Sequence, residues 1–140
     1  MSTPDRSKLV QDAHTTLQAL DRRGYDGPAG PVDLTAHLAR LEAGTRLYTP
    51  AQFEAVEDLL GPGLNDTRFP VTRETTLAAA RHLLGEHSGP VSVLNFPSTT
   101  TPGGGFLTGS TAQEESLCRA SALYATLERF PAYWSPPTGP

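Results

Sequence analysis

The segment that most constrains the fold is a strand pattern followed by a glycine-rich loop and a helix pattern. Residues 91–96, Val-Ser-Val-Leu-Asn-Phe, are rich in β-forming side chains and lie between two prolines, which predicts a short strand. Residues 97–110 are rich in Thr and Gly and predict a loop. Residues 112–129 carry apolar side chains at helical spacing, so we expect one helix there, ended by Pro131.

One strand–loop–helix unit does not make a sheet, because a strand needs neighbours along its edges. The rest of the chain has only weak strand patterns, near Val32, at residues 46–48 and at residues 68–72. Residues 25–31 are rich in Gly and Pro and predict a turn. Either the weak segments supply the missing strands, or part of the domain is absent from these 140 residues.

Helix patterns dominate the first 88 residues. Apolar residues at helical spacing predict helices over about residues 6–20, 33–43, 50–60 and 73–85. The last three begin after good N-cap residues, namely Asp33, Thr49 and Thr72, and Thr49 has Gln52 three residues later, as in a capping box. The expected buried residues are Phe53, Val56, Leu59 and Leu60 in the third helix and Leu77, Ala80, Leu83 and Leu84 in the fourth.

Charge and composition argue against several classes of protein. The formal net charge of −4 disfavours non-specific binding to nucleic acid, which needs a surplus of Lys and Arg. Cys118 is the one cysteine, so an internal disulfide is excluded, and together with four scattered histidines it argues against a metal site. No apolar run approaches the length of a membrane span, and the N-terminus lacks a signal-peptide pattern. We therefore expect a cytoplasmic monomer without a cofactor.

The loop contains three consecutive glycines, Gly103, Gly104 and Gly105, after the predicted strand. Because no Cβ shields the backbone there, its N–H groups can approach a ligand closely. In open α/β sheets, ligands bind beyond the carboxyl ends of the strands. A bare Gly-Gly-Gly is also typical of a surface turn without any ligand, and the glycines alone do not decide between these interpretations.

Two adjacent carboxylates, Glu114 and Glu115, lie in the first turn of the last predicted helix. Acidic residues there often only complement the helix dipole. However, adjacent helical positions differ by about 100°, and each glutamate shares its helix face with residues expected to be packed. Buried carboxylates need hydrogen-bond donors, and those in clefts are often functional. Two capping boxes are also available to this helix, from Ser110 to Gln113 and from Thr111 to Glu114.

The glycine loop and the glutamate pair together resemble a known signature. It consists of the triple glycine, seven further residues and then Gln113-Glu114-Glu115, and it is similar to that of poly(ADP-ribose) glycohydrolases, in particular their bacterial branch. The resemblance extends along most of the chain, through residues 23–25, 45–50, 71–79, 93–96 and 115–124. It implies a macrodomain-like three-layer α/β/α fold with an N-terminal helical extension, incomplete at the C-terminus. Residues 1–88 would hold the extension and the start of the α/β domain, and residues 89–140 the first half of the catalytic domain.

The resemblance also implies roles for individual residues. Glu115 would be the general acid and base in the hydrolysis of ribose–ribose O-glycosidic bonds of poly(ADP-ribose), releasing ADP-ribose, and Glu114 would hold ribose hydroxyls. The glycines would wrap the diphosphate, and Gln113 would support the loop and the glutamates. The further substrate-binding candidates are Asn95, Thr101 and Phe106. Thr101 stands where the bacterial branch usually has Asn, and its hydroxyl is shorter and offers fewer donors.

Three functions remain open from the sequence. The chain could be an enzyme of the DNA damage response that acts on poly(ADP-ribose) or on ADP-ribosylated proteins. Alternatively, it could be an ADP-ribose-binding module without turnover, or an inactive remnant of the enzyme. The second glutamate favours the enzyme, because a binding module has no need of it, whereas Thr101 favours a binding module.

Overall fold

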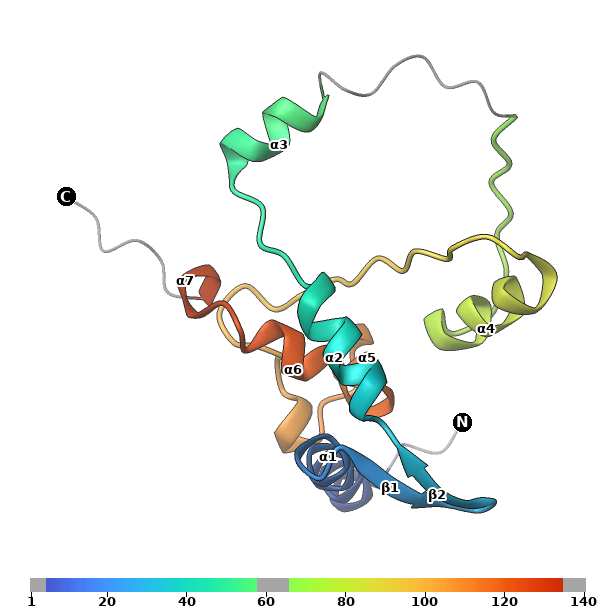
Figure 1. Ribbon diagram of the computed structural model, residues 1–140, viewed down its shortest axis with the longest axis vertical. Coiled ribbons are helices and arrows are strands. Elements are labelled where there is room, and N and C mark those ends of the chain that lie inside the picture. Colours follow the sequence, from blue (N-terminus) through green and yellow to red (C-terminus); the bar gives the residue numbers. More distant parts are fainter. Residues whose placement is uncertain (1–4, 58–65, 135–140) are drawn as a thin grey trace. The chain divides into compact units, whose positions relative to one another are not determined.

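The computed structural model describes residues 5–57 and 66–134 (Figure 1). The chain divides into two units by its internal contacts. The first comprises residues 1–45 together with 92–140, and the second comprises residues 46–91. The glycine loop and the glutamate pair both belong to the first unit, so this unit positions the candidate site.

The first unit is built around helix α1, Arg6–Asp21, which agrees with the predicted helix. The side chain of Asp5 caps it by accepting a hydrogen bond of 3.0 Å from the backbone N–H of Ser7. Ala13, at the middle of α1, is fully buried. It forms a small core with Phe106 and Cys118, around which four partly buried side chains pack, namely Leu17, Leu123, Tyr124 and Leu127.

An antiparallel hairpin follows α1, where the sequence predicted only a turn. Strands β1, Gly24–Gly27, and β2, Gly30–Asp33, pair with Tyr25 opposite Val32. Gly30 closes the hairpin with φ of +116°, a conformation that glycine adopts without strain. The weak strand pattern near Val32 is therefore confirmed, and the predicted turn is confirmed only at residues 28–29. The sequence did not reveal the flanking strands, because glycine and proline lower the apparent strand propensity.

Helix α2, Thr35–Gly44, follows the hairpin directly. The Asp33 carboxylate accepts a hydrogen bond of 2.8 Å from the backbone N–H of Thr35, although the N-cap residue itself is Leu34. Leu38 is the buried residue of this helix. The predicted helix over 33–43 is thus confirmed, with its start shifted by two residues.

The single predicted helix over residues 112–129 is instead two helices, α5, Gln113–Ala120, and α6, Leu123–Leu127. Ser121 separates them in an extended conformation, with φ of −155°. Its hydroxyl donates to the carbonyl of Leu117 at 2.8 Å and accepts from the N–H of Leu123 at 3.2 Å. The side chain thereby competes with the helical backbone bonds, which the apolar periodicity could not reveal. Pro131, predicted only as a stop, begins a short helix α7, Pro131–Trp134.

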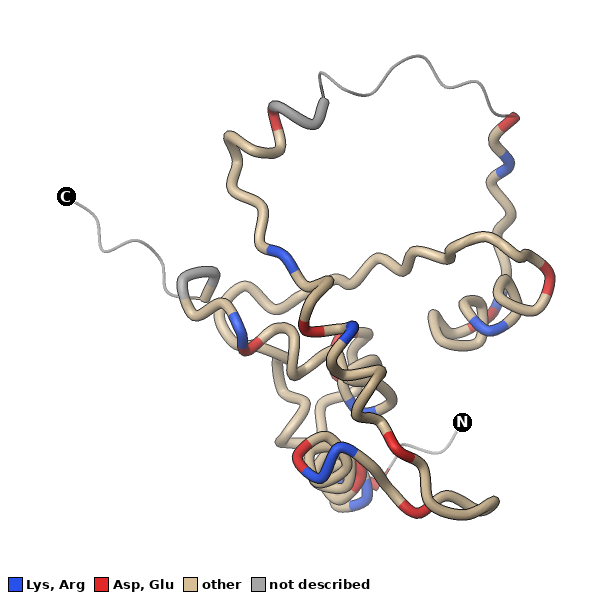
Figure 2. The backbone as a smooth tube through the Cα atoms, viewed as in Figure 1, with Lys and Arg blue, Asp and Glu red and all other residues tan. Residues whose placement is uncertain are grey.

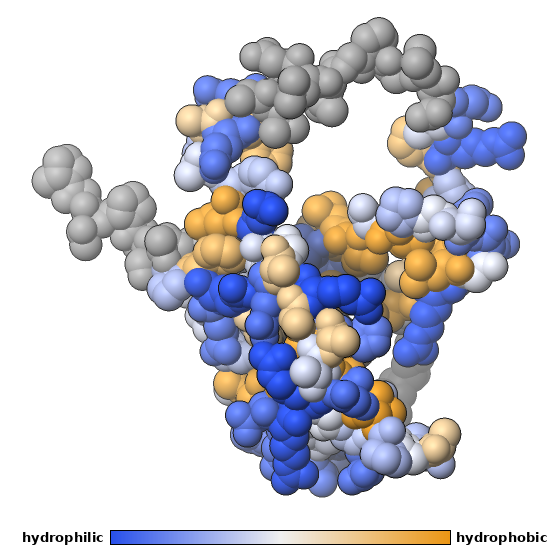
Figure 3. Space-filling view, viewed as in Figure 1, coloured by the Kyte–Doolittle hydropathy of each residue, from blue (hydrophilic) through white to orange (hydrophobic). Residues whose placement is uncertain are grey.

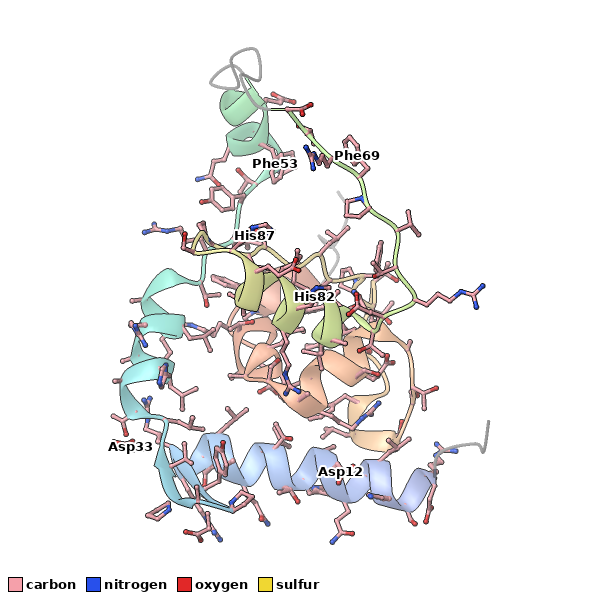
Figure 4. All side chains as sticks on the ribbon, turned by 90° about the vertical axis from the view of Figure 1, so that its right-hand side faces the viewer. Asp12, Asp33, Phe53, Phe69, His82 and His87 are labelled. Atoms are coloured by element: carbon pink, nitrogen blue, oxygen red, sulfur yellow. The ribbon has the colours of Figure 1, made fainter. Side chains whose placement is uncertain are left out.

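The second unit begins with helix α3, Pro50–Glu57, which has the predicted capping box. The Gln52 side chain accepts from the N–H of Thr49 at 2.8 Å, and Thr49 Oγ1 accepts from the N–H of Gln52 at 3.4 Å. The predicted buried face is wrong at Phe53, whose side chain is 63% exposed and is labelled in Figure 4. The predicted burial of Leu59 and Leu60 lies outside the described residues, as does that of the Val56 side chain.

Helix α4, Thr76–Glu86, also belongs to the second unit. Its N-cap is Thr75, which accepts from the N–H of Ala78 at 3.2 Å, so the predicted cap at Thr72 is wrong. Leu83 and Leu84 are exposed rather than packed inward. Residues 46–48 and 68–72 form no strand, and Phe69 is 87% exposed (Figure 4).

The best strand pattern in the sequence is not paired in the structure. Residues 91–96, the predicted strand, lie outside helices and strands, and the one sheet among the described residues is the two-stranded hairpin. Apolar side chains of this segment remain at the surface, including those of Leu94 and Phe96. Figure 3, coloured by hydropathy, shows that apolar residues occupy part of the surface of the chain. The residue pattern alone does not form a strand, because strand pairing needs a second segment.

Candidate active site

The glycine loop folds as a series of tight turns. Gly103 and Gly104 have φ of +69° and +54°, in the left-handed region where glycine is favoured. The N–H of Gly104 donates to the carbonyl of Thr101 at 3.0 Å, and the N–H of Phe106 donates to the carbonyl of Gly103 at 3.0 Å. A turn of 3-10 helix, η1 over Phe106–Thr108, then leads towards α5.

Glycine is required at these positions by space as well as by backbone conformation. A Cβ at Gly103 would lie 2.8 Å from the ring of Tyr124, and one at Gly104 would lie 2.6 Å from Glu115 Oε1. A Cβ at Gly105 would collide with the hydroxyl of Ser110. The loop is therefore packed against α5 and α6 at close range, and it is not a loose surface turn.

Glu115 faces this loop from the first turn of α5. Its side chain is only 8% exposed, and its Oε1 accepts a hydrogen bond of 3.0 Å from the backbone N–H of Gly105. The glycine backbone and the Glu115 carboxylate are thus in direct contact. Among the described residues, the second carboxylate oxygen, Oε2, has no hydrogen-bond partner.

Glu114 is held by residues that precede the glycine loop, Asn95 and Ser98. It is 2% exposed, its Oε2 accepts from Asn95 Nδ2 at 2.8 Å, and its Oε1 accepts from the N–H of Ser98 at 3.3 Å. The burial predicted for both carboxylates is confirmed, and neighbouring N–H groups compensate part of the cost of burying their charge. Asn95 Oδ1 is buried and has no partner among the described residues.

Gln113 ties the start of α5 to the extended segment that precedes the loop. Its Oε1 accepts from the N–H of Phe96 at 2.7 Å, and its Nε2 donates to the carbonyl of Leu94 at 2.8 Å. The N-cap of α5 is Ala112, so neither Ser110 nor Thr111 occupies the cap position that the two predicted capping boxes required. The side chains of Gln113 and Glu114 make tertiary contacts instead.

Cys118 and Tyr124 lie beside Gly103, where they belong to the apolar core of the first unit. Burial raises the pKa of the Cys118 thiol to about 12, with further contributions from the negative charges of Glu114 and Glu115. Burial also raises the pKa of Tyr124 to about 12, assisted by a hydrogen bond to Glu128. Cys118 is therefore a core residue whose burial disfavours the reactive thiolate form.

The structure brings the predicted site residues together within the first unit. Thr101 is exposed, and its backbone N–H donates to Ser98 Oγ at 3.3 Å. Phe106 is fully buried, with its ring centroid 5.0 Å from that of Tyr124, so its side chain packs in the core. Ser98 was missed by the sequence analysis, although Ser in a turn after a strand pattern often binds nearby backbone N–H groups.

A separate pocket of about 920 Å³ lies in the first unit between α1, the hairpin, α2 and the junction of α5 with α6. None of the predicted site residues lines it.

Acidic and basic residues are interspersed along the chain in Figure 2. In the part of the chain that the structure describes, no group of three His, Cys, Asp or Glu residues is placed to hold a metal ion, and no helix is long and apolar enough to cross a membrane.

The site thus consists of a glycine loop bonded to one buried glutamate, Glu115, with a second buried glutamate beside it in the sequence. Comparison with protein families identifies it further: residues 13–137 match the microbial-type PARG catalytic domain, and the chain belongs to that family. This confirms the resemblance seen in the sequence. No curated protein matches the chain.

Solved structures give the same result. The chain is similar to poly(ADP-ribose) glycohydrolase (PARG) from Thermomonospora curvata, with a TM-score of 0.87, 43% identity and 92% of this chain covered. A structure of that enzyme bound to the inhibitor ADP-HPD matches with a TM-score of 0.83, 42% identity and 92% coverage. The expected macrodomain-like α/β fold class is confirmed by this similarity. The chain spans about half of these structures, 48% of the first and 46% of the second.

Proposed function

We propose that this chain carries the catalytic glutamates of a poly(ADP-ribose) glycohydrolase and hydrolyses ribose–ribose O-glycosidic bonds, releasing ADP-ribose. The observation that carries the proposal is the buried Glu115 carboxylate, bonded through Oε1 to the Gly105 N–H and with Oε2 unpartnered among the described residues. The same bond anchors the glycine loop beside the carboxylate. A sugar bound against the loop would therefore meet Oε2.

The chemistry needs a positioned carboxylic acid. Protonated Glu115 would give its proton to the oxygen of the leaving ribose as the glycosidic C–O bond breaks through an oxocarbenium-like state. The resulting carboxylate would take a proton from water, whose oxygen then bonds to the anomeric carbon. These two transfers restore the protonated acid, so Glu115 acts first as acid and then as base.

The second glutamate is suited to binding rather than to proton transfer. Glu114 receives hydrogen bonds from Asn95 and from the N–H of Ser98, and both bonds favour its ionised form. Each carboxylate oxygen has a second lone pair that can accept from a ribose hydroxyl. We therefore assign Glu114 to holding the sugar, with Gly103 and Gly104 offering unshielded backbone to the diphosphate.

The proposal is tested by release of ADP-ribose from poly(ADP-ribose), measured by chromatography. Glu115→Gln keeps the size of the side chain but removes its acid, so release should fall by at least about 100-fold. Binding of ADP-ribose, measured by calorimetry, should survive. Glu54→Gln, at an exposed glutamate of α3, is the matched control and should release ADP-ribose like the unsubstituted chain. Full activity of the Glu115→Gln variant would exclude the role.

The second candidate function is a module that binds ADP-ribose without cleaving the polymer, and one specific observation favours it. Thr101 replaces the Asn usual in the bacterial branch, and its side chain is exposed and offers a single short donor. If calorimetry shows ADP-ribose binding while polymer is not cleaved by the unsubstituted chain, this function is the correct one. If neither binding nor cleavage occurs, the chain is an inactive remnant.

The cellular setting is part of the same proposal. We infer a cytoplasmic monomer that acts on poly(ADP-ribose) or ADP-ribosylated proteins in the DNA damage response, without binding nucleic acid directly. The net charge of −4 supports the last point. We also propose that residues 1–88 form the N-terminal helical extension and the start of the α/β domain, and that residues 89–140 form the first half of the catalytic domain. Cell fractionation and light scattering test location and oligomeric state.

A further inference from the structure

Helix α1 lies against both parts of the candidate site, although none of the predicted site residues belongs to it. It contacts η1, which continues the glycine loop, and it contacts α5, which carries the glutamates. Its buried residue Ala13 packs with Phe106 of η1 and with Cys118 of α5. The placement of the loop relative to Glu115 therefore depends in part on a helix that lies outside the site.

The start of α1 is tied to η1 by the side chain of Arg6. Its Nε donates a hydrogen bond of 2.7 Å to the carbonyl oxygen of Thr108, 102 residues further along the chain. The next residue, Gly109, is buried with φ of +82°, and a Cβ there would lie 2.8 Å from Arg6 Cγ. The stem of the Arg6 side chain is thus packed closely against the backbone that its Nε bonds.

Hydrogen bonds connect Thr108 in turn with the candidate acid. The N–H and the hydroxyl of Thr108 both donate to the carbonyl oxygen of Gly105, at 3.0 Å and 3.1 Å. The N–H of Gly105 donates to Glu115 Oε1 at 3.0 Å. Three successive hydrogen-bonded contacts therefore lead from Arg6 to the Glu115 carboxylate. A shift of η1 would displace Gly105, and with it the N–H that holds this carboxylate.

A second hydrogen bond ties the middle of α1 to the end of α5. Thr16 Oγ1 donates to the carbonyl oxygen of Arg119 at 2.6 Å, and it lies 3.0 Å from the carbonyl oxygen of Asp12 in its own helix. Carbonyl groups in the last turn of a helix have no partner within the helix, so Thr16 supplies one to α5. Thr16 and Arg6 are about 15 Å apart along the axis of α1, which thus holds the loop and the glutamate helix at separate points.

We propose that Arg6 is a positioning residue for Glu115. It fixes η1 on α1, so that the Gly105 N–H stays on the carboxylate, while Thr16 fixes α5 on the same helix. The inference deepens the proposed function and rests on it for the role of Glu115 as the acid. Such positioning matters because a displacement of about 1 Å can cost about 100-fold in rate.

Hydrogen exchange followed by NMR tests the positioning without any need for activity. Arg6→Ala removes the donor and should speed exchange of the Gly105 amide at least about threefold, as expected for one lost hydrogen bond, while the Cys118 amide in α5 is unchanged. Arg6→Gln places its Nε2 as many bonds from the backbone as Arg6 Nε, so it should keep exchange slow. Lys8→Ala removes a positive charge from an exposed position of α1 and is the control, which should exchange like the unsubstituted chain.

Release of ADP-ribose from poly(ADP-ribose) tests the consequence for the reaction. Arg6→Ala should lower kcat at least about fivefold and leave KM within about twofold, because Arg6 misplaces the acid without touching the sugar. Arg6→Gln and Lys8→Ala should keep most of the activity. Thr16→Val removes the hydroxyl while keeping the shape of the side chain, so it should lower kcat in the same way, and Thr16→Ser should restore it.

Three outcomes overturn the inference. The first is unchanged exchange of the Gly105 amide in Arg6→Ala. The second is equal acceleration at Gly105 and Cys118, which would mean that Arg6 only stabilises the whole unit. The third is an Arg6→Gln variant as impaired as Arg6→Ala, which would make the charge and not the donor responsible. If the unsubstituted chain releases no ADP-ribose, the proposed function fails, and the exchange rates still decide whether Arg6 holds the loop on Glu115.

Discussion

Replacing Gly104 by Ala tests whether the glycine loop and Glu115 form one unit. Gly104 has φ of +54°, and for a residue with a Cβ this conformation costs about 1–2 kcal/mol. The new Cβ would also lie 2.6 Å from Glu115 Oε1, so the carboxylate must move. Moving it breaks the hydrogen bond from the Gly105 N–H, and such a bond to a charged group contributes about 1.5–3 kcal/mol. The two effects together predict a loss of about 2.5–5 kcal/mol of stability.

The assay is reversible urea unfolding followed by circular dichroism, which gives the free energy of unfolding by linear extrapolation. Gly44→Ala is the control in the same unit, since Gly44 ends α2 and a Cβ there would meet nothing within 4 Å. That variant should be as stable as the unsubstituted chain or more stable by up to about 1 kcal/mol. If Gly104→Ala lies within about 0.5 kcal/mol of the control, the close contact between loop and carboxylate does not exist in solution.

Three further predictions follow from the hydrogen bonds and pKa shifts. The Cys118 thiol, buried and with a pKa of about 12, should resist a thiol reagent at pH 8 in the folded chain and react at once after unfolding in urea. Asn95→Ala removes a hydrogen-bond donor from the buried Glu114 carboxylate and should lower the free energy of unfolding by about 1.5–3 kcal/mol, measured in urea. Asn95→Gln keeps a carboxamide donor and should therefore lose less stability than Asn95→Ala. Hydrogen bonding to Glu86, with a smaller contribution from Glu74, raises the pKa of the exposed His82 above its usual value near 6.5. NMR titration should therefore give a pKa for His82 above 6.5, and Glu86→Gln should reduce the shift.

Each of these has a contradicting result. Rapid labelling of folded Cys118 would show that the core opens easily, and an unchanged stability of Asn95→Ala would show that the Glu114 contact is not formed. For His82 the raised pKa means that its ion pairs stabilise the folded state below about pH 6.5 and that this contribution is lost as the pH rises through the folded pKa. A stabilising contribution that instead grew with pH would contradict the assignment.

Much of the candidate site could be predicted from the sequence because its signals are local. The spacing between the triple glycine and Gln113-Glu114-Glu115 identified the family, and helical geometry placed both glutamates on packed faces. Their observed burial, 2% for Glu114 and 8% for Glu115, agrees with that reasoning. The capping box at Thr49 and the first helix were predictable for the same reason, since all of their partners lie within a few residues.

The tertiary structure decided what depends on partners far along the chain. Gln113 could have completed a capping box with Ser110, but its side chain bonds Leu94 and Phe96 instead, 19 and 17 residues away. Residues 91–96 have the strongest strand pattern and no paired neighbour within the described chain, whereas Val32, in a weak pattern, pairs with Tyr25. Sequence propensity determines which backbone conformations and helix faces are favourable, but strand pairing and side-chain hydrogen bonds are chosen by whichever distant segment the fold brings within reach.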